Sequence, residues 1–435
     1  MKEKVSIFWF RRDLRLQDNV GFLAALKGGY PVLPIFIFDK LILDKLPKYD
    51  ARVSFIFENL QKMRTQLAES HASSIAFFYG NPKNVFKALT QGYDVQSVYT
   101  NSDYEPYANE RDTAIEQFLK TKEISFSRSK DQVIFEKDDI VKGDGTPYVV
   151  YTPFKNKWKE TFNADYLEPS DTYPYFSNLI QNTSLPNLTL SDMGFTNSDI
   201  RVPDYNASPD VINNYEATRN FPAIQNGTSR LGPHLRFGTV SIRQMMTKAI
   251  AEENEVFWNE LIWREFFMQI LWHFPHTVNK SFRTKYDRIE WRNNEAEFEK
   301  WTNGQTGYPL VDAGMRELNA TGYMHNRVRM LVASFLCKHL LIDWRWGETY
   351  FAQKLLDYDL SANVGNWQWA AGSGVDAAPY FRIFNPTTQI EKFDKQKEYI
   401  NTWVPDLQEL TYPTPMVDHK MARERCLKVY KEAVA

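Results

Sequence analysis

The chain has 435 residues, of which 43% are hydrophobic and 24% are charged, and its formal net charge is −2. This composition excludes wholesale disorder, and no apolar run approaches the roughly 20 residues that a membrane helix needs. The two cysteines, Cys337 and Cys426, exclude a disulfide framework and a cysteine-based metal cluster, so we expect a cytoplasmic protein without a bound metal.

The first 130 residues alternate short apolar strands with helical stretches, a pattern that predicts a parallel α/β sheet. We expect strands at 5–10, 32–38, 75–79, 97–100 and 124–127, and helices at 51–69 and 107–120. No GxGxxG motif follows the first strand and no GxxxxGK[ST] motif occurs, so the usual NAD fingerprint and the P-loop are absent.

The rest of the chain changes character twice. Residues 165–210 are rich in Ser, Asn, Asp, Thr and Pro with little periodicity, which is typical of a long surface connection. From residue 209 on, helical spacing dominates. We therefore predict an α/β domain at 1–130, a linker at 131–208 and an all-α domain at 209–435.

Tryptophan is concentrated in the helical region. Ten of the 12 tryptophans lie between Trp258 and Trp403. A core can be built from Leu and Ile alone. Such a tryptophan cluster therefore indicates an interface, a cofactor site or electron transfer, although an aromatic core remains an alternative.

The turn at 226–238 combines hydroxyl groups, a guanidinium and glycines. Thr228, Ser229 and Arg230 precede Pro233, which suits the first turn of a helix. N–H groups at a helix start attract anions, but an ordinary Ser/Thr-capped helix explains the same residues.

The segment 260–267 places Glu260, Trp263, Arg264 and Phe267 on one face of a helix. An indole can stack on a base while a carboxyl group bonds its polar edge. An ion pair on an aromatic surface between domains is the alternative.

Two further segments, 326–330 and 356–369, also combine charged, amide and apolar side chains. Arg327 could meet phosphates, while Asn326 and Met330 could meet a base or a cofactor, although a solvated helix face is an alternative. Asp357 and Asp359 precede an asparagine and two tryptophans, and no nearby His or Cys completes a metal site.

Together these segments resemble the photolyase/cryptochrome family, and within it the class I cyclobutane pyrimidine dimer photolyases. The resemblance rests on FWFRRDLRLQDN at 8–19, TSRL at 228–231, ELIWRE at 260–265, and the stretch from GYP at 307–309 to NPTTQ at 385–389. It implies an N-terminal Rossmann-like α/β antenna domain followed by an all-α, FAD-binding domain.

The resemblance implies a set of FAD contacts. Among them Asn363 matches the residue that faces flavin N5, and Phe257 stands where many relatives carry Trp. The implied contacts are Tyr215, Thr228, Ser229, Arg230, Leu231, Gly232, Phe257, Asp357, Tyr358, Asp359 and Asn363.

The resemblance also implies an electron relay and a DNA site. Trp367, Trp344 and Trp291 match the family's electron relay from the surface to the flavin. Electron tunnelling weakens steeply with distance, so intermediate indoles divide one long transfer into several short ones. Trp263 and Trp369 resemble walls for a flipped-out dimer, Glu260 its hydrogen-bonding carboxyl group, and Asn326 and Met330 further lesion contacts. Arg219, Arg264 and Arg327 match cations at the pocket rim.

The implied activity is light-driven repair of pyrimidine dimers in DNA by electron transfer from FADH⁻, by a monomer. For the antenna, Asn109 and Glu110 resemble ligands of methenyltetrahydrofolate, with Lys280 as a further partner, while deazaflavin, a flavin or no antenna remain alternatives.

Three other functions would leave different features in the sequence. A cryptochrome photoreceptor predicts a long C-terminal extension and a different residue at 363, and a (6-4) photolyase predicts paired histidines near 324–330. An unrelated flavin oxidoreductase predicts a dinucleotide fingerprint. The sequence favours dimer repair over all three.

Overall fold

The computed structural model describes residues 2–252 and 254–435. The chain forms two compact units whose segments interleave along the sequence. The first unit comprises Met1–Glu136, Phe162–Asp204 and Leu231–Lys248, and the second comprises Lys137–Thr161, Tyr205–Arg230 and Ala249–Ala435. The predicted division into 1–130, 131–208 and 209–435 stays a prediction. The two compact units have other bounds: part of the predicted linker belongs to the second unit, and 231–248 belongs to the first.

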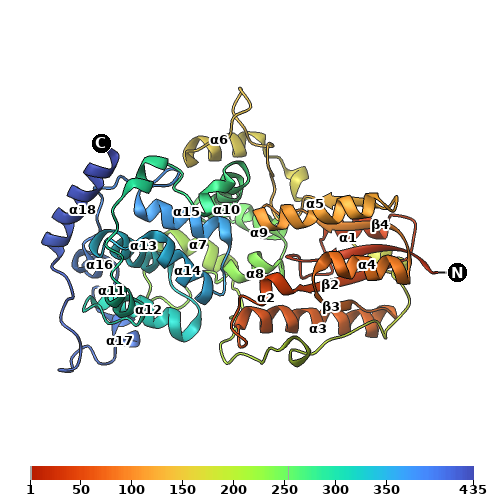
Figure 1. Cartoon of the computed structure of the whole chain (residues 1–435), viewed down its shortest axis with the longest axis horizontal. Helices are drawn as coiled ribbons and strands as arrows, with labels where there is room; N and C mark the ends of the chain where they lie inside the picture. Colours follow the sequence, from red (N-terminus) through yellow and green to blue (C-terminus); the bar gives the residue numbers. More distant parts are fainter. Residues whose placement is uncertain (1, 253) are drawn as a thin grey trace. The chain divides into compact units, whose positions relative to one another are not determined.

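The first unit is built on a five-stranded sheet in the order β3-β2-β1-β4-β5, with every neighbouring pair parallel (Figure 1). This confirms the predicted α/β class. The strands are β1 (Lys4–Phe10), β2 (Val32–Asp39), β3 (Ala76–Gly80), β4 (Asp94–Asn101) and β5 (Ser125–Ser129).

Both faces of the central strands are buried, as expected of a parallel sheet. Phe8 and Phe10 of β1 lie in one apolar cluster, whereas Ile7 and Trp9 lie in another. The alternation follows from the two-residue period of a strand. The helices of this unit are α1 (Val20–Leu26), α2 (Lys40–Leu43), α3 (Ala51–His71), α4 (Pro82–Gly92), α5 (Pro106–Lys120) and α8 (Gly232–Phe237); α9 (Ile242–Ala251) begins in it.

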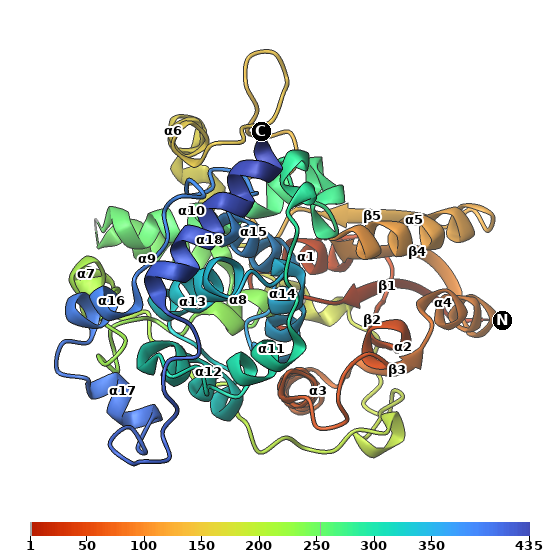
Figure 2. The same cartoon turned by 60° about the vertical axis from the view of Figure 1, so that its left-hand side comes forward.

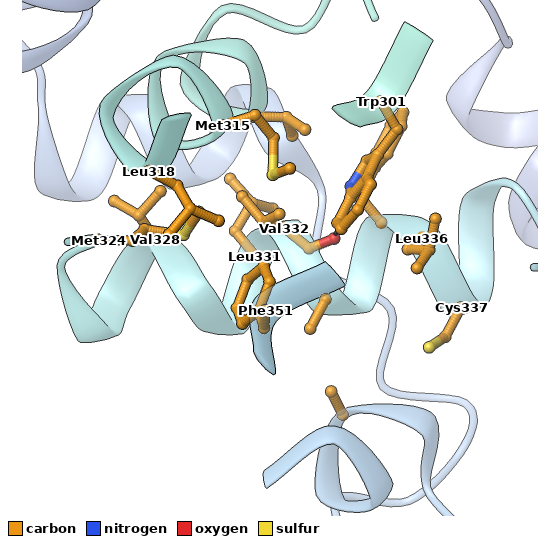
Figure 3. Packing of buried hydrophobic residues seen from close by; sticks show 14 of the residues in the cluster. Trp301, Met315, Leu318, Met324, Val328, Leu331, Val332, Leu336, Cys337 and Phe351 are labelled. Atoms are coloured by element: carbon orange, nitrogen blue, oxygen red, sulfur yellow. Dashed lines mark hydrogen bonds between the residues drawn. The ribbon is translucent and has the colours of Figure 1, made fainter. Parts of the chain in front are cut away.

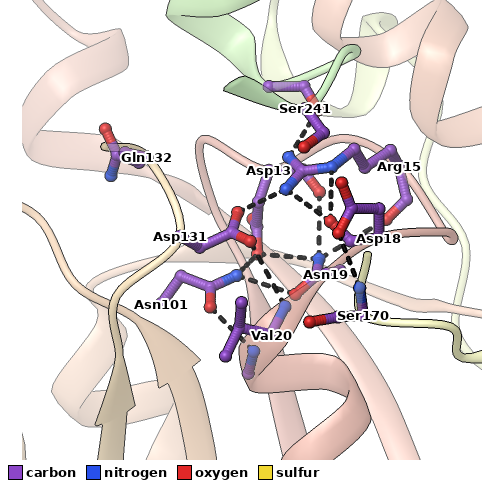
Figure 4. Close-up of polar contacts among 12 residues, drawn as sticks. Asp13, Arg15, Asp18, Asn19, Val20, Asn101, Asp131, Gln132, Ser170 and Ser241 are labelled. Atoms are coloured by element: carbon purple, nitrogen blue, oxygen red, sulfur yellow. Dashed lines mark hydrogen bonds and ion pairs between the residues drawn. The ribbon is translucent and has the colours of Figure 1, made fainter. Parts of the chain in front are cut away.

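A buried polar network lies beyond the carboxyl end of β1 (Figure 4). Arg243 donates to Asp18 and Asp131 at 2.8 Å, and Arg15 donates to Asp131 at 2.5 Å. Asn101 joins the network through Asn19 at 2.8 Å. These bonds tie α9 and the segments after β1, β4 and β5 into one body.

The second unit is helical, as predicted (Figures 1 and 2). Short 3₁₀ turns supplement its helices at Pro275–Val278 and Thr284–Arg288, and others lie in the first unit at Ala164–Leu167, Tyr173–Asn178 and Ser191–Met193. Its helices are α6 (Tyr151–Thr161), α7 (Pro209–Thr218), α10 (Glu255–His273), α11 (Glu295–Thr302), α12 (Pro309–Thr321), α13 (Asn326–Ser334), α14 (Trp344–Lys354), α15 (Leu360–Ala371), α16 (Pro386–Phe393), α17 (Glu398–Trp403) and α18 (His419–Val434).

The core of the second unit centres on α12, α13, α14 and α15 (Figure 3). Trp301 is fully buried there and donates to the carbonyl of Val332 at 3.3 Å. Helix α13 runs into a π-helical turn, Phe335–His339, against which α18 packs. In the described residues, no helix has the length and apolar character to cross a membrane.

Candidate functional site

One side of helix α10 carries the predicted DNA-facing residues. Asn254 caps this helix by accepting from the N–H of Phe257 at 3.0 Å. Glu260 forms an ion pair with Arg219, which ends α7. The Arg219 guanidinium also lies 5.2 Å from the ring centre of Tyr215. The structure therefore brings together a predicted lesion-binding acid, a predicted rim cation and a predicted cofactor residue.

Trp263 and Trp369 stand on α10 and α15, two helices that pack against each other. Both indoles are partly buried, as are Arg264 and Met330. Trp263 is stacked face to face on Tyr151, with ring centres 3.5 Å apart and planes 7° apart.

The start of α13 carries the other predicted DNA contacts. Asn326 is exposed, while the guanidinium of Arg327 hydrogen-bonds Asn220 and lies 4.4 Å from the ring centre of Phe393. Burial, with the nearby positive charge of Arg219, lowers the pKa of Arg327. Arginines that repel one another in a partly buried position indicate an anion-binding surface.

The two halves of the predicted cofactor site meet at the start of α13. Thr228 lies 3.4 Å from the hydroxyl of Tyr323, and the guanidinium of Arg230 lies 3.5 Å from the centre of the same ring. Arg329 forms a two-pronged ion pair with Asp357, at 2.9 and 3.1 Å. The Arg329 guanidinium lies 5.9 Å from the centre of the Tyr323 ring, so these two residues connect 228–230 with the acidic segment at 357–359.

His325 supplies a buried donor at the same place. Its Nδ1 accepts from the N–H of Arg327 at 3.1 Å, so in the neutral ring the proton sits on Nε2. That Nε2 has no hydrogen-bond partner among the described residues, and the side chain is 4% exposed. Burial, together with four nearby arginines, lowers the pKa of His325 to about 3, so the ring is neutral at pH 7.

Helix α15 carries the predicted flavin-facing residues. Asp359 caps it by accepting from the N–H groups of Ser361 and Ala362. Asn363 donates through Nδ2 to the Glu348 carboxylate at 2.9 Å and to its carbonyl at 3.1 Å. The Oδ1 of Asn363 accepts no hydrogen bond from the described residues, so the amide presents an acceptor. Burial raises the pKa of Glu348.

The three predicted relay tryptophans share one hydrophobic cluster. Trp367 and Trp344 are buried within it, and Trp291 is half-buried against it. Gly347 permits the close approach of α14 to α15, because a Cβ there would lie 2.1 Å from the Trp367 ring. Trp291, the predicted surface end of the relay, is the most exposed of the three.

The remaining predicted residues are distributed between the units. Phe257 is buried, and its ring meets Tyr215 edge to face at 5.2 Å. Tyr358 is partly buried beside the Asp357 pair. Leu231 and Gly232 fall in the first unit, as do Asn109 and Glu110 on α5, whereas Lys280 falls in the second.

Four residues near the site were missed by sequence reasoning: Glu348, Tyr323, Tyr151 and His325. Each directly contacts a residue that was predicted for the site. The only sequence signal for them was an aromatic or acidic residue within a helical pattern, which is common. No group of three His, Cys, Asp or Glu side chains poised to hold a metal occurs within residues 2–252 and 254–435.

The donor set fits FAD. Hydroxyls, a guanidinium and a buried imidazole N–H suit a pyrophosphate, and a carboxylate and an oriented amide suit a ribose and a flavin ring. The unpartnered Nε2 of His325 is the buried polar atom that such a ligand would satisfy.

Comparisons with known proteins identify the family. Residues 257–411 match the family model "FAD binding domain of DNA photolyase", and residues 6–174 match "DNA photolyase". The chain is 38% identical to the deoxyribodipyrimidine photo-lyase of Synechococcus sp., covering 99% of this chain and 97% of that protein.

Solved structures show the same fold. A class III photolyase from Agrobacterium tumefaciens matches with a TM-score of 0.87 and 34% identity, over 100% of this chain and 98% of that chain. An archaeal photolyase from Sulfolobus tokodaii, which holds two FAD molecules, matches with a TM-score of 0.83 and 34% identity, over 99% and 100% of the two chains.

Proposed function

Because the chain belongs to the DNA photolyase family, we propose that it repairs cyclobutane pyrimidine dimers in DNA with light, as a deoxyribodipyrimidine photo-lyase. The observation that carries the proposal is the arrangement in the second unit. A paired acid and arginine, Glu260 and Arg219, and a stacked indole, Trp263, stand beside the residues that fit FAD.

FAD is the cofactor of the matched domain. When bound as FADH⁻ it supplies, after absorbing light, one electron that splits the dimer and then returns. The chain's own residues bind this cofactor, orient it and exclude water.

Thr228, Ser229 and Arg230 hold the phosphate side, with the neutral His325 as an additional donor. Arg230 has a positive φ of 55°, a left-handed backbone that this turn imposes on a residue other than glycine. Arg329 fixes Asp357 by two hydrogen bonds and so pre-orders the acid that faces the ribose and flavin.

Asn363 faces the flavin, and Glu348 positions it. Since the Glu348 oxygens occupy Nδ2, the amide turns its carbonyl oxygen to the site. An acceptor there suits the N–H of the reduced flavin ring. Trp367, Trp344 and Trp291 then form the path by which an external reductant restores the reduced cofactor.

Glu260 and Arg219 read the pyrimidine edge. A carboxylate paired with arginine accepts hydrogen bonds, so Glu260 suits the N–H of a thymine ring, and Arg219 suits its carbonyl oxygens. Trp263 and Trp369 supply apolar walls. Flipping out a dimer costs less than flipping a normal pair, because the dimer is already poorly stacked.

The DNA backbone is held by the partly buried cations at the rim, Arg264 and Arg327. Asn326 and Met330 extend this surface toward the lesion. Phosphate contacts position the duplex, whereas the pocket recognises the damage.

Further parts of the proposal concern the antenna and the state of the protein. Asn109 and Glu110 would hold methenyltetrahydrofolate, although the Sulfolobus tokodaii relative holds a second FAD. We propose a class I enzyme that acts as a monomer in the cytoplasm, where its DNA substrate lies. The absorption spectrum of the purified protein separates folate, flavin and deazaflavin antennae.

The test is a repair assay. Protein with reduced FAD, illuminated with blue light, should remove thymine dimers from an oligonucleotide, and dark samples should not. Dimer binding without light-dependent loss would instead favour a cryptochrome photoreceptor.

Glu260→Ala should lower the repair yield at least several-fold while FAD stays bound, because the pyrimidine loses its hydrogen-bonding partner. Repair yield per absorbed photon and FAD content are the measurements. A yield equal to that of the unaltered protein would refute the role of Glu260.

A further inference from the structure

Helix α6 and the residues before it belong to the second unit and are tied to helix α10 along its length. Gln269 of α10 donates to the carbonyl of Ile140 at 2.7 Å. The indole of Trp158 donates to the buried carboxylate of Glu265 at 2.6 Å. The segment lies within the predicted linker at 131–208, and these bonds join it to α10.

Tyr151, the first residue of α6, packs against α10. It is 7% exposed, and its hydroxyl donates to the carbonyl of Asn259 at 2.8 Å. Burial and the neighbouring carboxylate of Glu260 raise the pKa of Tyr151, so the phenol stays neutral and keeps donating.

The ring of Tyr151 covers one face of Trp263 in parallel stacking, at 3.5 Å and 7°. An indole on a helix surface can otherwise turn about two side-chain bonds. Stacking against a ring that is itself buried and hydrogen-bonded removes this freedom before any ligand arrives, which lowers the entropy cost of binding.

We propose that Tyr151 is a positioning residue for the lesion pocket, which fixes the plane of Trp263 so that its remaining surface meets the pyrimidine dimer. This inference rests on the proposed function, because it takes Trp263 to be a wall of that pocket. It assigns discrimination between dimer-containing and undamaged DNA partly to α6.

The test uses the full chain with FAD bound, in the dark. One duplex carries a single thymine dimer, and a second duplex of the same sequence is undamaged. The measured quantity is the ratio of the two dissociation constants, together with FAD content and thermal stability.

Tyr151→Leu keeps apolar volume but removes the stacked ring, so it should weaken dimer binding by about 3- to 10-fold. Binding to undamaged DNA and FAD content should stay unchanged. Tyr151→Phe keeps the ring and loses only the hydroxyl, so it should restore discrimination to within about 2-fold of the unaltered protein.

Phe154→Leu is the matched control. Phe154 lies on the same helix and is 2% exposed, but it packs on Phe266 rather than on Trp263. This variant should lose thermal stability and keep the ratio of dissociation constants.

Two outcomes overturn the inference alone. In the first, Tyr151→Leu keeps the preference for dimer-containing over undamaged DNA while Trp263→Ala reduces that preference. In the second, Phe154→Leu reduces the preference as much as Tyr151→Leu does, which would show that any loss of packing around α6 suffices. If Trp263→Ala leaves the ratio unchanged, the proposed role of Trp263 fails and the inference falls with it.

Discussion

The two units treat buried charge differently. In the first, Asp18 and Asp131 are 0–1% exposed. Arg243 forms ion pairs with both, and Arg15 forms a further ion pair with Asp131. In the second, Arg230 forms no ion pair with any described residue, and the buried Nε2 of His325 has no partner there.

This difference separates structural charge from binding charge. An ion-paired network holds segments together, and removing its shared cation leaves buried carboxylates less well compensated. Buried donors that the protein leaves unpaired cost free energy, so their persistence beside an anion-suited turn indicates a ligand. The expected effects of four substitutions sharpen the contrast, from the largest to the smallest.

Arg243→Leu should cost about 3–5 kcal/mol of unfolding free energy, because it leaves two buried carboxylates without their shared cation. Denaturant unfolding followed by circular dichroism measures this. Arg201→Leu is the control, since its pair with Glu58 is exposed and is expected to contribute about 1 kcal/mol or less. Equal effects of the two substitutions would contradict the structural role of the network.

Lys338→Met should remove a pH dependence of stability. Lys338 is 1% exposed and donates to the carbonyl of Arg382 at 2.8 Å, and burial lowers its pKa from 10.5 to about 8. The unfolded chain therefore binds more protons between pH 8 and 10.5, so stability should rise with pH across this window, by up to about 3 kcal/mol. Unfolding free energies at pH 7.5 and 10 should show a flatter profile in the variant.

Arg329→Met should weaken FAD retention about tenfold or more, because Asp357 loses two charge-assisted hydrogen bonds. FAD release during dialysis measures the effect. Arg316→Met is the matched control, since Arg316 makes a similar two-pronged pair with Asp406, away from the predicted cofactor residues. Loss of FAD in both variants would show that any broken ion pair suffices.

Trp344→Phe should have the smallest effect on repair itself. The indole is buried and its Nε1 has no partner among the described residues, so a phenyl ring replaces it without breaking a hydrogen bond. Photoreduction of oxidised FAD should slow, while repair with chemically reduced FAD should be unchanged. Unchanged photoreduction kinetics would remove Trp344 from the relay.

Local pattern was enough to predict several parts of the molecule. The five strands overlap the predicted runs. The signal is clearest in β1 and β2, where nearly every residue is buried, whereas β5 is largely exposed. The face of α10 that carries Glu260 and Trp263 followed from helical spacing alone. The motif order identified the family, which the full-length relatives confirm.

Only the tertiary structure decided which residues act on one another across distant segments. Tyr151 and Trp263 lie 112 positions apart, and nothing in either local pattern indicates that their rings stack at 3.5 Å. The same holds for Glu348 behind Asn363 and for Tyr323 between the two halves of the cofactor site. Sequence patterns report periodic burial within an element, whereas such contacts depend on how elements pack. The sequence by itself determined the fold class and the family, and it predicted residues for the candidate site; packing alone decided the partners and orientation of these residues.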